Sequence, residues 1–150
     1  DWLQREHDLN RPRPAPVPVA TIAGTWIGRM QFTFPGLPNA CLDTRVDLVQ
    51  TDLTVRGQWI VTSPNNDIKG EIAGTLEGVG DATTFRGTVQ WNSEISTYTG
   101  RCFGQATFTG PSAPPQIRWH AARWQMQNCA DHGLTDIVWT LAPPPTSACR

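Results

Sequence analysis

Charge is scarce in this sequence, and lysine is almost absent. Charged residues make up 17% of the 150 residues, the formal net charge is −1, and Lys69 is the only lysine. Without a basic surface, the chain is not expected to bind nucleic acid. Long apolar runs are missing too, since none approaches the ~20 residues that a transmembrane helix needs. We therefore predict neither a nucleic-acid partner nor a transmembrane segment.

Sequence signatures of catalysis are also missing. No Gly-x-Ser-x-Gly nucleophile motif occurs, and the cysteines include no Cys-x-x-Cys pair. Cys129, Asp131 and His132 offer metal ligands from one loop, but zinc usually needs three or four convergent ligands, and Cys129 is better suited to a disulfide. The prediction is therefore no catalytic residue, no metal and no cofactor. An enzyme that acts mainly by shaping its substrate, such as a barrel cyclase or isomerase, is kept as a third reading.

The cysteines that are present indicate the compartment. Cys41, Cys102, Cys129 and Cys149 are an even number at wide spacing, which favours two disulfides and an oxidising environment. Three connectivities are possible. The pairing Cys41–Cys102 with Cys129–Cys149 is favoured, because the second bond would pin the tail to a nearby loop. With its first residue Asp1 rather than Met, the chain is expected to be processed, and to be secreted or periplasmic.

The first 20 residues differ from the rest in composition. The stretch RPRPAPVPV (residues 11–19) predicts an extended, polyproline-like strap. Two interpretations of residues 1–20 are open: a flexible leader, or an arm whose Trp2 and Leu3 dock on a protein partner. Residues 21–150 form the predicted folded domain.

From Ala23 onward, apolar residues alternate with polar ones at the period of a β-strand. The alternating runs cover residues 25–34, 42–49, 53–61, 68–77, 85–91, 98–108, 117–121 and 137–141. The connections are short and rich in turn residues, so neighbouring strands are expected to pair antiparallel. We predict an all-β fold, an eight-stranded antiparallel up-and-down barrel, with a two-sheet sandwich as the alternative.

The inward-facing register combines large rings with glycines. Five of the seven tryptophans fall on it: Trp26, Trp59, Trp91, Trp119 and Trp139. Glycine weakens a strand unless it permits a bend or leaves room for a neighbouring ring. Rings that face glycines either fill a narrow interior or border a pocket, and the sequence leaves both possibilities open.

Two stretches resemble the calycin barrels, the group that includes lipocalins, fatty-acid-binding proteins and avidins. AGTWIG (residues 23–28) looks like the Gly-x-Trp start of these barrels, with Gly24 and Trp26 at the matching positions. In that group the tryptophan plugs the closed end, which implies a structural role for Trp26. TVQWNSEISTYTGRCF (residues 88–103) resembles the hairpin between the fifth and sixth strands of avidin-like proteins.

The avidin-like resemblance implies a ligand pocket. On that match Trp91, Ser93, Thr97 and Tyr98 line the pocket, and Trp119 falls near another pocket tryptophan. Strand direction separately places Trp91 and Tyr98 at the loop-bearing, open end. A cleft bounded by Trp119 is therefore expected beside these two rings.

Arg123 is expected on the inward register of Trp119, near the open end. There it would either receive a ligand carboxylate or stack on the tryptophan. The favoured function is an extracytoplasmic barrel that binds a small apolar or aromatic molecule at its open end. The alternative is a non-catalytic interaction module, or an accessory subunit of a larger assembly, that docks through residues 1–20.

Overall fold

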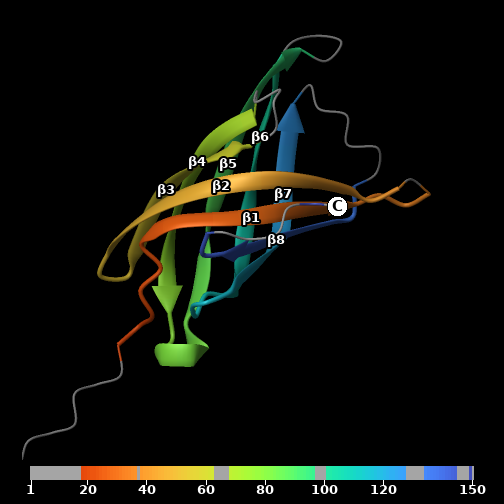
Figure 1. The fold of residues 1–150 in the computed structure, drawn as a ribbon. Helices are drawn as coiled ribbons and strands as arrows, with labels where there is room; N and C mark the ends of the chain where they lie inside the picture. The colour runs from red at the N-terminus through yellow and green to blue at the C-terminus, as the bar shows by residue number, and fades with distance from the viewer. Residues whose placement is uncertain are drawn as a thin grey trace, which may run out of the picture.

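Eight antiparallel strands close into a barrel in the computed structural model, which describes residues 18–36, 38–62, 68–96, 101–127, 134–144 and 149 (Figure 1). The strands are β1 (Gly24–Thr33), β2 (Ala40–Thr51), β3 (Thr54–Val61), β4 (Ile68–Glu77), β5 (Thr84–Ser96), β6 (Arg101–Pro111), β7 (Ile117–Gln127) and β8 (Asp136–Ala142). A short 3-10 helix, η1 (Gly80–Ala82), lies between β4 and β5.

Each strand pairs with its neighbours in sequence, and β1 also pairs with β8 to close the barrel. The predicted up-and-down barrel is confirmed, and the sandwich alternative is wrong. Closure satisfies the backbone hydrogen bonds of both outermost strands, which would otherwise form exposed edges. No helix in the described part of the chain is long and apolar enough to span a membrane.

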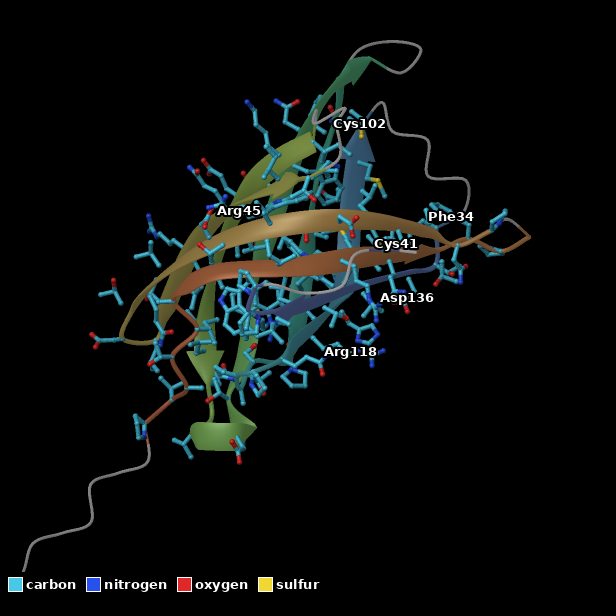
Figure 2. The ribbon with its side chains drawn as sticks, in the orientation of Figure 1. Phe34, Cys41, Arg45, Cys102, Arg118 and Asp136 are labelled. Atoms are coloured by element: carbon cyan, nitrogen blue, oxygen red, sulfur yellow. A yellow bond between two sulfur atoms is a disulfide. The ribbon has the colours of Figure 1, made fainter. Side chains whose placement is uncertain are left out.

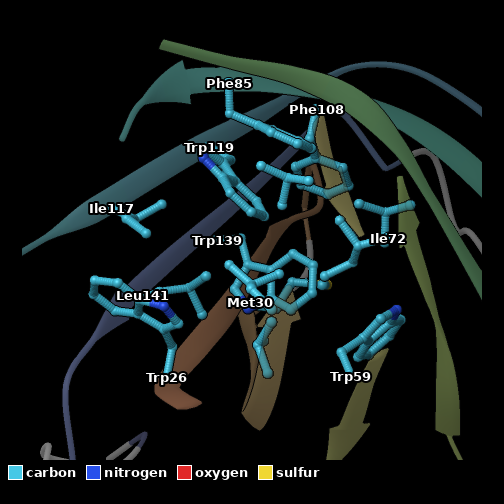
Figure 3. Close-up of a cluster of buried hydrophobic side chains, with 14 of the residues drawn as sticks. Trp26, Met30, Trp59, Ile72, Phe85, Phe108, Ile117, Trp119, Trp139 and Leu141 are labelled. Atoms are coloured by element: carbon cyan, nitrogen blue, oxygen red, sulfur yellow. The ribbon is translucent and has the colours of Figure 1, made fainter. Parts of the chain in front are cut away.

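The interior is packed with aromatic rings (Figure 3). Trp119 and Trp139 are fully buried and lie edge to face, with ring centroids 5.8 Å apart. Phe85 stacks on Trp119 at 4.2 Å, and Phe108 meets Trp139 at 5.8 Å. Offset and edge-to-face contacts of this kind add to the stabilisation from burying the rings. The middle of the barrel is therefore a filled core.

Four of the five inward tryptophans donate their indole N–H to an acceptor of the protein. The acceptors are Ile22 O for Trp26 (2.9 Å), Gln90 O for Trp59 (3.0 Å), Ser112 Oγ for Trp119 (2.9 Å) and Thr44 Oγ1 for Trp139 (2.8 Å). A buried donor without a partner would be costly. Ser112 and Thr44 are themselves fully buried, so these two polar residues lie inside the barrel to satisfy the indoles.

The inward glycines provide the room that these rings need. The indole of Trp59 crosses Gly70 on the next strand, where a Cβ atom would lie 2.7 Å from Nε1. Trp91 covers Gly104 in the same way, with its Cζ2 atom 2.7 Å from the position of a Cβ. Any larger residue at either glycine would collide with the ring and with the backbone of the neighbouring strand.

Residues 18–23 seal one end of the barrel, at which the β2–β3 turn and η1 also lie. The side chain of Gln50 accepts a hydrogen bond from Ile22 N (2.8 Å) and donates one to Ala20 O (3.2 Å). Thr83 Oγ1 accepts a bond from Ala20 N (2.8 Å), and Ile22 is fully buried. We call this the sealed end. Of the expected leader, residues 18–20 thus contact the barrel, and residues 1–17 lie outside the described residues.

Candidate functional site

The opposite end of the barrel carries the connections at residues 34–39, 62–67, 97–100 and 128–135, and we call it the loop end. In Figure 1 the β1–β2 and β5–β6 hairpins extend away from each other there. Of the inward apolar side chains at this end, Val61 and Ile137 are buried. Seven others pack on the core but are only partly buried: Phe32, Phe34, Leu42, Ile68, Trp91, Trp124 and Met126. This set is called the apolar rim. It is the candidate functional site, because the inward residues below it are fully buried.

Trp91 differs from the other four inward tryptophans. Its ring lies over Gly104 and remains partly exposed. Within the described residues, Trp91 Nε1 has no hydrogen-bond partner, whereas each of the other four indoles has one. An indole of this kind can contact a ligand through its apolar face and donate a hydrogen bond to it through its N–H group. Of the expected pocket residues, Trp91 is the one that the structure shows as a partly exposed ring on the inward register at the loop end.

A β-bulge in β7 decides which residues reach the rim. The pairing of β6 with β7 shifts by one residue between Phe108–Ala121 and Thr107–Arg123. After the shift Trp124 and Met126 face inward, and Arg123 is exposed on the outer face beside Thr107. The expected inward register of Arg123 is therefore wrong, because the extra residue of a bulge reverses the alternation of every residue that follows it.

Sequence reasoning missed Trp124 and Met126, although the sequence does contain a signal for them. Apolar residues occupy odd positions up to Ala121 and even positions from Trp124 onward. Such a switch of parity within one strand is typical of a bulge. The rim therefore gains two large apolar side chains from beyond residue 121, where the predicted alternating run ends.

The remaining expected site residues lie in different places. Trp119 is fully buried, stacked on Phe85 and bonded to Ser112, so it has no exposed surface for a ligand. The backbone of Ser93 pairs with Ile68 at the loop end of β5. Thr97 and Tyr98 lie outside the described residues. The expected cleft between Trp91 and Tyr98 therefore stays a prediction.

The disulfide pattern differs from the favoured pairing. Cys41 bonds Cys149, with Cα atoms 5.9 Å apart, so the expected Cys41–Cys102 bond is wrong. Cys41 lies on the outer face of β2 near the loop end, labelled in Figure 2, and the backbone N–H of Cys149 donates to Asp43 Oδ1. Cys102 is also disulfide-bonded, while Cys129 is outside the described residues. The bond ties the chain's tail to β2 beside the rim.

No member of the apolar rim is charged, and the ion pairs of the described residues lie on the outer face. Arg45 points away from the barrel in Figure 2 and lies 3.6 Å from Asp47. His120 Nε2 and Asp136 Oδ2 are 3.8 Å apart on exposed side chains. Across the described residues, no three His, Cys, Asp or Glu side chains gather as metal ligands. The described side chains of the rim offer apolar contact surface.

No protein-family model matches the chain, and no curated protein matches it. The eight-stranded closed antiparallel barrel is consistent with the calycin architecture. Membership of that group, and the avidin-like resemblance of residues 88–103, stay predictions. The barrel itself is compatible with ligand binding.

Proposed function

We propose that this protein is an extracytoplasmic carrier or receptor barrel, which binds a small apolar or aromatic molecule at its loop end. The observation that carries the proposal is the difference in burial along the inward register. Seven large apolar side chains stay partly exposed at the loop end. Inward residues of the sealed half, such as Phe85, Ile117 and Leu141, are completely buried. Ligand sites are typically concave, mostly apolar and equipped with a few polar groups.

Trp91 supplies a polar group of this kind. Its indole N–H has no partner among the described residues. Within the rim, Met126 lies one strand beyond Gly104, the residue that pairs with Trp91. A bound ligand with one acceptor would satisfy this donor and cover the exposed ring. Ser93, Thr97 and Tyr98, which follow Trp91 on the same hairpin, are proposed to complete the site.

The compartment is proposed from the disulfides. Cys41–Cys149 joins residues 108 positions apart, and such bonds persist in oxidising surroundings. A secreted or periplasmic barrel whose core is filled toward the sealed end, and which has an apolar rim at the loop end, would be suited to binding sparingly soluble molecules. The interaction-module alternative rests on residues 1–20, most of which lie outside the described residues.

The test uses the neutral aromatic dye N-phenyl-1-naphthylamine, whose emission rises when it enters an apolar site. The unmodified protein should enhance the emission of the dye in a saturable way. Trp91→Ala should weaken dye binding about tenfold or more, since it removes the ring and the donor together. Phe103→Ala is the matched control, because Phe103 is a 43% exposed ring on the outer face rather than on the rim.

Absence of dye binding by the unmodified protein, or equal loss in Trp91→Ala and Phe103→Ala, would overturn the proposal. In the first case the interaction-module alternative becomes the better account. Circular dichroism of each variant establishes that the barrel is intact before binding is compared.

A further inference from the structure

The outer face of the barrel carries a row of carboxamide and carboxylate side chains that crosses six strands. Direct cross-strand pairs join Asp47 to Gln58, Gln58 to Glu71, Glu71 to Gln90, Gln90 to Gln105, and Gln105 to Gln125. All six residues are exposed. We call them the glutamine row. It belongs to the opposite face of the sheet from the apolar rim, so a role for it is separate from the function proposed above.

The glutamine row lies along grooves in the outer surface. One groove has a volume of about 680 Å³, and a second of about 500 Å³ adjoins it. Both are lined by Asp47, Gln58, Glu71 and Gln90. Two smaller hollows, of about 400 and 160 Å³, continue past Gln105 and Gln125. The row therefore follows a continuous series of depressions.

The side chains of the row are not engaged by the protein itself. Across the described residues, the carboxamides of Gln58, Gln90, Gln105 and Gln125 have no hydrogen-bond partner, whereas the carboxamide of Gln50 makes three bonds. Asp47 at the end of the row is the exception. Its carboxylate accepts a bond from Thr25 Oγ1 at 2.6 Å and lies 3.6 Å from Arg45.

We propose that the glutamine row binds a neutral, linear oligosaccharide that lies across the strands. Each carboxamide offers two hydrogen-bond donors and an acceptor. A sugar hydroxyl group also both donates and accepts, so it can bond to either end of the carboxamide. Asp47 and Glu71 add acceptors for further hydroxyl protons. Strands are spaced by about 4.8 Å, so the row repeats its amides at a spacing comparable to the length of one pyranose unit in an extended chain. Each carboxamide is therefore matched to the hydroxyl groups of one sugar unit.

Neighbouring residues support a sugar rather than another polymer. Phe103 lies in the next row, paired with Asn92, and its ring is 43% exposed. A ring of this kind packs against the apolar C–H face of a sugar. Nucleic acid is disfavoured, because the two larger grooves are lined by two carboxylates, Asp47 and Glu71, and two cations, Lys69 and Arg56. They therefore present no net positive charge to attract a phosphate backbone.

A peptide strand is disfavoured for a different reason. An extended peptide usually binds by adding to the free edge of a sheet, where it meets backbone N–H and C=O groups. The closed barrel pairs β1 with β8 and leaves no such edge. The groove crosses the strands, whose backbone groups are already paired with neighbouring strands in the closed barrel. A ligand with many hydroxyl groups uses these side chains better than a peptide backbone does.

The experiment titrates the full chain with cellohexaose, laminarihexaose, mannohexaose and chitohexaose, and follows ¹⁵N-labelled side-chain amides by NMR. At least one hexasaccharide should bind with a dissociation constant of about 1 mM or lower. Side-chain amide signals of Gln90 and Gln105 should shift on binding. The double variant Gln90→Ala/Gln105→Ala should bind at least about tenfold more weakly.

The matched control is Gln31→Ala/Gln116→Ala, which removes two exposed carboxamides that lie outside the grooves. It should leave sugar binding unchanged, and both double variants should keep the circular dichroism spectrum of the barrel. Failure of all four sugars to bind at 10 mM (about ten times the weakest expected dissociation constant) would overturn the proposal. Equal weakening by the two double variants, or shifts confined to the apolar rim, would also overturn it.

Discussion

The two ends of the barrel are built from the same strands but reach different degrees of closure. At the sealed end, residues 18–23 fold over the core, and Gln50 and Thr83 bond to their backbone. At the loop end the apolar rim stays partly exposed, and Trp91 Nε1 has no partner within the described residues. A protein that needed only stability would benefit from closing both ends. The difference between the ends is the basis of the function proposed for the loop end.

One inward row of residues illustrates the difference. Trp26, Trp59 and Trp91 lie in a single cross-strand row, through Val46 and Gly70. The first two are 5% and 4% exposed, and Trp91 is only partly buried. Strands tilt relative to the axis of a barrel, so a row perpendicular to the strands climbs from one end towards the other. The same residue type thus serves as a plug at the sealed end and as a rim at the loop end.

The largest expected effect on stability comes from Trp26, the tryptophan at the sealed end. Trp26→Ala should lower the free energy of unfolding by ~3–5 kcal/mol, since it leaves a cavity in the core and removes the bond to Ile22 O. Trp91→Ala should cost only about 1–2 kcal/mol, because its ring is partly solvated already. Urea denaturation of both variants checks the comparison. Equal losses in the two variants would mean that the ends do not differ in the way described.

An intermediate effect is expected at the disulfide beside the rim. Cys41→Ser/Cys149→Ser should lower the free energy of unfolding by about 2–4 kcal/mol, because the bond closes a long segment of chain, 108 residues in sequence separation. Hydrogen exchange should accelerate near Leu42 at the loop end and stay slow near Val55 at the sealed end. Non-reducing peptide mapping provides the control. A peptide that joins Cys41 to Cys102 would contradict the structure.

The smallest expected effect concerns the bulge in β7. Arg123→Ala should change the free energy of unfolding by less than about 0.5 kcal/mol, as is usual for an exposed position. It should also leave dye binding unchanged, since Arg123 lies on the outer face. Trp124→Ala should be the more destabilising of the two and should weaken dye binding. The opposite order would place Arg123 inward and remove Trp124 from the rim.

Much of the fold could be predicted because period-two alternation is a local property. The inward assignments of Val46, Trp59, Ile72 and Phe85 follow directly from it, and all four are buried. The alternating run predicted at residues 53–61 starts on the same register with Leu53, but Leu53 is 52% exposed because it lies in the two-residue β2–β3 turn. The alternation therefore holds within strands and ends with them.

The candidate site was harder to predict, since it depends on contacts between distant segments. Trp91 and Trp119 share the inward register and a similar sequence context, yet Trp119 is fully buried. Its stacking partner Phe85 comes from β5, two strands away. The disulfide partner of Cys41 lies 108 residues away, and no local pattern distinguishes the three connectivities.

The sequence by itself determined that the chain forms eight antiparallel strands, and which residues of most strands face inward. Alternation, short turns and glycines opposite rings act between neighbours in the chain or on adjacent strands. Only the tertiary structure decided that Cys149 returns to Cys41, that the bulge brings Trp124 inward, and that Trp26 is a plug while Trp91 is a rim. These outcomes depend on strand tilt, on one extra residue in β7 and on the contact of Cys149 with β2, which arise only when the barrel closes.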